Sequence, residues 1–278
     1  MLEYMDRFSG RRIVSVAMMT NSILPLFVVL ASSLSALGCI AAEGATDSDE
    51  SLDSVQQPVL SSNALSNNAL SNNALSNNAL SNNALVMSAL TDPKARELLK
   101  YVVSCALKPA DSVEFTVNGV NYSYPGELGL AASWGKPNGK CDATCKGWVS
   151  ACVISRVDFA GEKVSVSLRG DHPALATTKA ERASHTFREG AYYGNIFGAP
   201  NSQVYYACSS PGNVGIPRVC GPSNDDCVVD VVGSCNHTCN GPSQDGSYND
   251  CRDEARSGCG FPQGSKVYPQ TITVFLKP

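Results

Sequence analysis

Apolar residues recur at helical spacing in two stretches of the chain. In the first, "DPKARELLKYVVSCA", Asp92 suits an N-cap and Pro93 the first helical position, and apolar residues then return at i, i+3, i+4 and i+7. The second stretch, "CKGWVSACVISRV", keeps the same spacing from Cys145 to Val153. Each pattern predicts a helix with one buried face.

Elsewhere apolar and polar residues alternate, which is the pattern of a half-buried strand. The stretch "SVEFTVNGVNYSY" alternates on both sides of Asn118-Gly119, a pair that tolerates the positive φ angles of a tight turn, and so predicts a β-hairpin. Further strand candidates are residues 164–168, 203–207, 228–232 and 271–276. Together these elements predict a single disulfide-rich α+β domain over residues 89–278, with two main helices and a mainly antiparallel sheet.

Residues 61–88 contain a repeat with the unit SNNAL, which fits neither regular element. A period of five moves successive leucines around a helix axis, and it places alternate leucines on opposite faces of a strand. The alternative is a pentapeptide-repeat solenoid, but Asn68 stands where such repeats place a small residue before the inward leucine. We predict a disordered low-complexity tether, preceded by an acidic linker over residues 39–60.

The first 38 residues have the composition of an export signal. Arg7, Arg11 and Arg12 form a basic region, and the apolar core "ILPLFVVLA" is too short to span a bilayer comfortably. We predict that residues 1–38 are a signal peptide that is removed. The twin arginines also partly resemble a Tat signal, although the residues after Arg12 fit that pattern poorly.

The sequence "LSALGC", which ends at Cys39, resembles the lipobox of bacterial lipoproteins. Ala36 and Leu37 depart from its usual residues, and an ordinary secretory cleavage site is the alternative. The resemblance implies a lipid on Cys39, which would hold the protein at a membrane. Ile40 is not acidic, which by the same resemblance implies an outer-membrane lipoprotein, facing the periplasm or exposed at the surface.

The chain has 12 cysteines, a density typical of exported proteins with disulfides. With Cys39 lipidated, the others allow five disulfides and leave one cysteine unpaired. The disulfide candidates are Cys105, Cys141, Cys145, Cys152, Cys208, Cys220, Cys227, Cys235, Cys239, Cys251 and Cys259. Their connectivity cannot be derived from the sequence alone, and the one pair that we expect joins Cys105 and Cys152, between the two predicted helices.

Several phrases of the domain resemble uncharacterised cysteine-rich lipoproteins of Gram-negative bacteria. They include "ELLKYVVSCAL", "YPGELGLAASW", "WVSACVISRV", "SLRG" and "EGAYYGNIF", and the resemblance covers most of residues 92–278. It implies one exported domain, and it brings no assigned activity and no catalytic residue.

A thiol hydrolase is the enzyme that the sequence allows. The stretch "TCKGWV" loosely resembles the start of the catalytic helix in cell-wall peptidases of the NlpC/P60 kind, with Cys145 as nucleophile and His185 or His172 as base. Lys146 replaces the serine of that pattern, and Cys141 lies close enough in sequence to oxidise Cys145.

A metal site is a second candidate. The motifs "CDATC" and "CNHTC", the latter with Cys235, His237 and Cys239, offer ligands that Zn²⁺ would accept. Because exported cysteines are usually oxidised, we expect disulfides there, with no metal and no cofactor.

The stretch "EGAYYGNIFG" has two interpretations. Tyr192 and Tyr193 could contact a glycan, since aromatic rings stack on the apolar faces of sugars while tyrosine hydroxyls form hydrogen bonds. The alternative is a structural turn with buried aromatic residues.

Charge excludes one class of partner. The acidic linker contains five acidic residues and no basic one, while the chain beyond the repeat is close to neutral. A nucleic-acid partner would need a basic face, so none is expected. We therefore expect a lipid-anchored protein of the cell envelope, a non-catalytic binding or structural module for protein or glycan, with the thiol hydrolase as the alternative.

Overall fold

The computed structural model describes residues 89–136, 139–198, 202–213, 215–222, 227–258 and 260–278, all within one compact unit, Leu52–Pro278. The predicted signal peptide, the acidic linker and the repeat tether lie outside these residues, as do Cys39 and Cys259. The described elements are helices and sheets with both antiparallel and parallel strand pairs, which confirms the α+β fold class.

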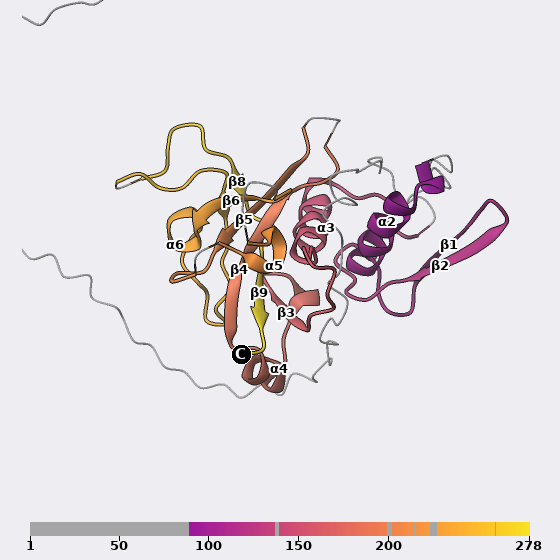
Figure 1. Cartoon of the computed structure of the whole chain (residues 1–278), viewed down its shortest axis with the longest axis horizontal. Helices are drawn as coiled ribbons and strands as arrows, with labels where there is room; N and C mark the ends of the chain where they lie inside the picture. Colours follow the sequence, from indigo (N-terminus) through magenta and orange to yellow (C-terminus); the bar gives the residue numbers. More distant parts are fainter. Residues whose placement is uncertain (1–88, 137–138, 199–201, 214, 223–226, 259) are drawn as a thin grey trace, which may run out of the picture. The chain divides into compact units, whose positions relative to one another are not determined.

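A five-stranded sheet forms the middle of the domain (Figure 1). In spatial order its strands are β3 (Val166–Arg169), β9 (Ile272–Leu276), β4 (Phe187–Asn195), β5 (Val204–Ser209) and β6 (Asp230–Ser234). Neighbouring strands are antiparallel except β5 and β6, which are parallel. The sheet is therefore mainly antiparallel, as predicted.

Both faces of this sheet are buried, because successive side chains alternate between two clusters. In β4, Tyr192 belongs to the larger cluster and Tyr193 to the smaller one, and in β5 Ala207 and Cys208 divide in the same way. The larger cluster includes the apolar faces of the two main helices, while the smaller one includes cysteines and tyrosines of the C-terminal segment. The sheet thus separates two cores of different composition.

The two predicted helices are present as α2 (Pro93–Ala106) and α3 (Ala143–Ser155). Each begins with an aspartate cap, since the Asp92 carboxylate accepts the Lys94 N–H and the Asp142 carboxylate accepts the Cys145 N–H. Helix α3 packs against β4 and β9, and α2 packs against α3 (Figure 1).

The predicted hairpin consists of β1 (Ser112–Val117) and β2 (Val120–Pro125), paired through a two-residue turn. The turn residues have positive φ, 50° at Asn118 and 78° at Gly119. Phe115 and Tyr122 stack across the two strands with ring centroids 5.3 Å apart, and Arg96 of α2 lies 5.1 Å from the Tyr122 centroid. The aromatic face of the hairpin therefore packs against α2.

Shorter elements connect these parts. They are η1 (Ala89–Thr91), η2 (Pro173–Leu175), α4 (Lys179–Ser184), α5 (Pro217–Cys220), α6 (Cys235–Thr238), β7 (Cys251–Arg252) and β8 (Val267–Tyr268), of which β7 and β8 pair with each other. No helix in the described part of the chain is long and apolar enough to cross a bilayer.

Five disulfides cross-link the domain, and they join all of the described cysteines. The pairs are Cys105–Cys152, Cys141–Cys145, Cys208–Cys235, Cys220–Cys227 and Cys239–Cys251. The first of them joins α2 to α3, as expected from the sequence.

Candidate functional site

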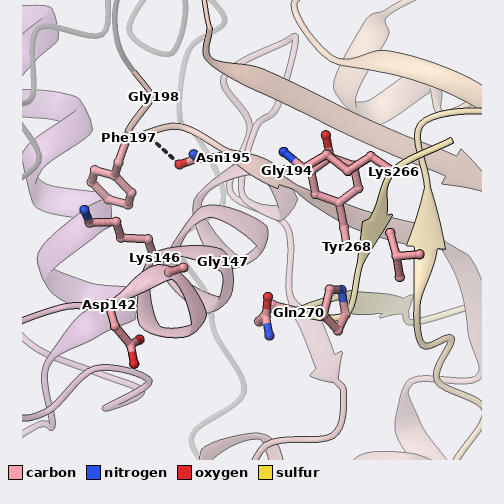
Figure 2. Close-up of a pocket in the computed structure, with 13 residues that line it drawn as sticks. Asp142, Lys146, Gly147, Gly194, Asn195, Phe197, Gly198, Lys266, Tyr268 and Gln270 are labelled. Carbon is pink, nitrogen blue, oxygen red and sulfur yellow. Dashed lines mark hydrogen bonds between the residues drawn. The ribbon is translucent and has the colours of Figure 1, made fainter. Parts of the chain in front are cut away.

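A groove of about 470 Å³ lies where three distant segments of the chain meet. Its walls are formed by residues 142–147 at the start of α3, residues 194–198 at the end of β4, and residues 266–270, which include β8. Figure 2 shows side chains from all three segments around one shared space. The groove is the candidate functional site.

The start of α3 is fixed by local bonds on both sides of its cap. The Cys145 N–H donates to the Asp142 carboxylate at 2.8 Å, and the Cys141–Cys145 disulfide ties the residue before the cap to the first helical turn. At Gly147 an added Cβ would lie 2.6 Å from Oε1 of Gln270. The absence of a side chain therefore lets the α3 backbone approach the third segment directly.

Tyr268 connects the groove to the smaller core. Its ring packs against Tyr193 and Tyr206, with centroid distances of 5.6 and 5.5 Å, and only 8% of the residue is exposed. Burial, and then the neighbouring Tyr206, raise the pKa of the Tyr268 hydroxyl, so it stays protonated at neutral pH. The ring is thus a rigid, neutral part of the wall.

The groove presents cationic and amide groups. The Lys266 ammonium lies 5.0 Å from the Tyr268 ring centroid, and within the described ranges it forms no ion pair (Figure 2). Asn195 uses its Oδ1 to accept the Phe197 N–H at 3.0 Å, and the Gln270 side chain forms no hydrogen bond to a described residue. These groups can therefore donate hydrogen bonds to a ligand.

The charge balance of the lining favours an anion. Lys146 and Lys266 stand on two different walls, whereas Asp142 is the one carboxylate among the described lining residues. That carboxylate already accepts the Cys145 N–H. The arrangement can bind an anionic, hydroxyl-rich molecule, and its lining includes no cysteine, serine or histidine.

Cys145 does not present a thiol. It is bonded to Cys141, so the nucleophile that the hydrolase hypothesis requires is absent from the described structure. Cys145 is therefore no nucleophile while this disulfide is intact. The sequence already contained a sign of this bond, because only three residues lie between the two cysteines.

The two candidate bases, His172 and His185, contact groups other than Cys145. His172 accepts the Ala174 N–H at its Nδ1, and its ring packs against Trp148. His185 is 1% exposed, and its Nε2 lies 3.1 Å from the Ser165 hydroxyl. Burial lowers the pKa of both histidines. None of their described contacts involves Cys145, so the structure does not bring the proposed nucleophile and base together.

The cysteines of "CNHTC" take part in two different disulfides, Cys208–Cys235 and Cys239–Cys251. His237 between them is exposed. The cysteines of "CDATC" are bonded to each other. Disulfides thus occupy the cysteines of both motifs, as expected from the sequence.

Tyr192 and Tyr193 do not form a glycan-binding surface. Both are 0% exposed, because they lie in the middle of β4, a strand covered on both faces. The Tyr192 hydroxyl donates to the Glu189 carboxylate at 2.7 Å, and the Tyr193 hydroxyl donates to the Arg252 carbonyl at 2.8 Å. The alternative interpretation was right about the buried aromatic residues and wrong about the turn, because the stretch as far as Asn195 belongs to the central strand of the sheet.

The groove residues were not identified from the sequence. Lys146 and Lys266 are far apart in the chain; in the sequence Lys146 stands out only as a departure from the peptidase pattern around Cys145, and Lys266 lies in none of the motifs considered. The available signal was indirect, since the helix predicted from Cys145 onward forms one wall. No family model matches the chain, and neither a curated protein nor a solved structure is similar to it.

Proposed function

We propose that the protein is a lipid-anchored, non-catalytic binding protein of the cell envelope, and that its groove binds an acidic saccharide. The observation that carries the proposal is the pair of lysines on two walls of a polar groove, with amide donors between them. The disulfide at Cys145 supports a binding role over the thiol hydrolase.

An acidic saccharide fits this lining for two reasons. Its carboxylate can form charge-assisted hydrogen bonds with a lysine ammonium, which are stronger than neutral ones. Its hydroxyl and amide groups can bond to side chains such as Asn195 and Gln270. A purely apolar ligand would leave these polar groups without partners, which costs free energy.

We expect the Lys266→Ala variant to bind N-acetylmuramic acid, a sugar with a free lactyl carboxylate, roughly 10- to 100-fold more weakly than the unchanged protein, because a charge-assisted hydrogen bond contributes about 1.5–3 kcal/mol. Isothermal titration calorimetry with this sugar measures the change. Lys163→Ala is the matched control, since Lys163 is exposed and lies outside the groove lining.

N-Acetylglucosamine, which lacks the lactyl carboxylate, separates charge from general sugar binding. We expect the unchanged protein to prefer N-acetylmuramic acid over this neutral sugar, and raised salt to reduce the preference. Equal affinity for both sugars, or an equal loss in Lys163→Ala and Lys266→Ala, would contradict the proposed site.

The anchor is tested separately. We expect the full-length Cys39→Ser variant to move from the detergent phase to the aqueous phase in Triton X-114 partitioning, because several acyl chains on one cysteine give stable membrane attachment. Cys259→Ser is the control, and it should stay in the detergent phase. Unchanged partitioning of Cys39→Ser would rule out a lipid on that residue.

A further inference from the structure

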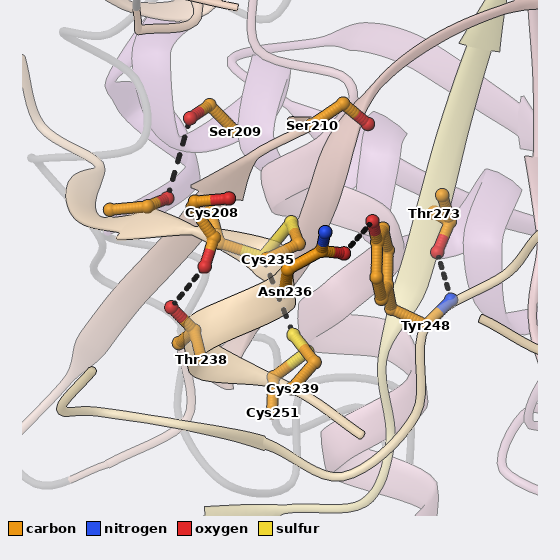
Figure 3. Close-up of a disulfide and its surroundings, with 12 residues drawn as sticks. Cys208, Ser209, Ser210, Cys235, Asn236, Thr238, Cys239, Tyr248, Cys251 and Thr273 are labelled. Atoms are coloured by element: carbon orange, nitrogen blue, oxygen red, sulfur yellow. Dashed lines mark hydrogen bonds between the residues drawn. A yellow bond between two sulfur atoms is a disulfide. The ribbon is translucent and has the colours of Figure 1, made fainter. Parts of the chain in front are cut away.

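Two disulfides lie directly against each other in the smaller core. The Sγ atoms of Cys208 and Cys239, which belong to different disulfides, are 3.4 Å apart (Figure 3). All four cysteines of this sulfur cluster, Cys208, Cys235, Cys239 and Cys251, are at most 1% exposed. The two disulfides are therefore buried at the same place, and they touch through the sulfur atoms of Cys208 and Cys239.

Three elements bring the sulfur cluster together. Cys208 lies on β5, Cys235 begins α6 and Cys239 caps its end one helical turn later, and Cys251 begins β7. The segment between Cys239 and Cys251 is fixed to the sheet, because the Tyr248 N–H donates to the Thr273 hydroxyl at 2.7 Å. The Tyr248 hydroxyl donates to Asn236 of α6 at 2.9 Å. These contacts hold the sulfur atoms side by side.

This arrangement distinguishes the cluster from the other disulfides. Among the described residues, Cys208, Cys235 and Cys239 are the one group of three potential ligand residues whose sulfur atoms lie within 4.8 Å of one another. Cys220, in contrast, has the carbonyl of Val229 beside its sulfur, at 3.9 Å. Only the sulfur cluster thus places a cysteine next to a disulfide that it does not belong to, within the described part of the chain.

Thiol–disulfide exchange requires contact of this kind. A thiolate attacks one sulfur of a disulfide, forms a new bond to it, and releases the other sulfur as a thiolate. We propose that the two disulfides of the sulfur cluster act as one exchange unit, in which an opened Cys239 transfers the second bond from Cys208–Cys235 to Cys208–Cys239.

The step balances without an external oxidant. A small dithiol first reduces the Cys239–Cys251 bond to two thiols and is itself oxidised to a disulfide. The Cys239 thiolate then attacks Sγ of Cys208, the Cys208–Cys235 bond breaks, and Cys235 leaves as a thiolate that takes up a proton. Release from Cys251 allows the Cys239 side chain to rotate into line with the bond that it attacks. Reduction at one pair thereby produces a thiol on α6, the helix that begins at Cys235.

The Cys251→Ser variant tests the transfer without any reductant, because it leaves Cys239 as a thiol. We expect disulfide mapping of the folded variant, after acid quenching and maleimide labelling in denaturant, to find both Cys208–Cys235 and Cys208–Cys239, with label on both Cys239 and Cys235. The interconversion rate should rise roughly tenfold per pH unit below the thiol pKa, because the thiolate is the nucleophile. It should not depend on protein concentration.

Cys227→Ser is the matched control. It leaves Cys220 as a thiol with no second disulfide described beside it, so among the ten cysteines of the described disulfides label should appear on Cys220 alone. Labelling of Cys239 without any labelling of Cys235 in Cys251→Ser would overturn the proposal, and so would pairing of Cys239 with a cysteine outside the sulfur cluster.

If Cys251→Ser fails to fold, the unchanged protein decides the question. Treatment with less than one equivalent of dithiothreitol should then yield the Cys208–Cys239 peptide pair. Its absence, while Cys239–Cys251 is reduced, would overturn the exchange.

Discussion

Loss of the Cys105–Cys152 disulfide is expected to lower the free energy of unfolding by about 4 kcal/mol. The two cysteines are 47 residues apart in sequence, and a cross-link of that span removes a large part of the entropy of the unfolded chain. Both are 0% exposed and join α2 to α3, so the bond also fixes the packing of the larger core. Urea unfolding of the Cys105→Ala/Cys152→Ala variant measures the change.

The Cys220→Ala/Cys227→Ala variant is the control for this prediction. Its cysteines are seven residues apart, so the same entropy relation gives about 2 kcal/mol. The double replacement in each case avoids an added thiol. If the short-span variant were the less stable of the two, loop entropy would not explain the ranking.

We expect Arg218→Met to destabilise the domain by about 3–5 kcal/mol, because it leaves the Glu189 carboxylate buried without its cation. The two side chains are 7% and 5% exposed, and Nη2 of Arg218 lies 2.7 Å from the carboxylate. Burial acts to lower the pKa of Arg218, but Glu189 outweighs it, and the pKa is raised above its ordinary value. Chemical unfolding at neutral pH tests the prediction.

The same arginine also joins two layers of the fold. It donates to the carbonyls of Ser155 and Val157 at the end of α3, while Glu189 belongs to β4. Arg182→Met is the matched control, because Arg182 is exposed and its side chain, among the described residues, forms hydrogen bonds only to Thr177. A loss below 1 kcal/mol in Arg218→Met, or an equal loss in both variants, would show that the pair contributes little.

A double replacement separates the free energy contributed by the Arg218–Glu189 ion pair from that contributed by each side chain alone. Arg218→Met combined with Glu189→Leu removes both charges and leaves apolar volume, so we expect it to cost less than the sum of the single replacements. The Tyr192 hydroxyl, which donates to Glu189, loses its acceptor in this variant, and part of the cost therefore remains.

The elements that follow a local pattern could be predicted from the sequence. Helix α2 has an aspartate cap and one apolar face, and the hairpin has alternating residues around Asn118-Gly119. In both cases one side of the element faces solvent, so the spacing of apolar residues in the sequence follows the period of the helix or of the strand.

Strand β4 could not be predicted in this way. Because it is buried on both faces, its sequence lacks the alternation that marks a half-buried strand. Its glycines are required by packing, since a Cβ at Gly190 or Gly194 would collide with the backbone of β5. The same glycines, read locally, indicated a turn around Tyr192 and Tyr193.

The groove is a product of tertiary structure, which local patterns do not encode. Lys146 lies on a helix and Lys266 comes just before a two-residue strand, and only the folded sheet places them on one groove. The disulfide pairing also could not be predicted from local patterns, with the exception of Cys105–Cys152. That pair could be expected because each cysteine lies on a predicted helix. The sulfur cluster combines three elements, of which α6 and β7 are too short to be predicted.

The position of β9 sets the order of assembly. It lies between β3 and β4 and is hydrogen-bonded to both, yet it follows every other described strand along the chain. Until residues 272–276 join the sheet, β3 has no described partner strand and the larger core lacks Ile272 and Val274. Closure of the sheet therefore depends on the last described strand, so short-range disulfides such as Cys141–Cys145 can form before the long-range contacts that give the domain its final shape.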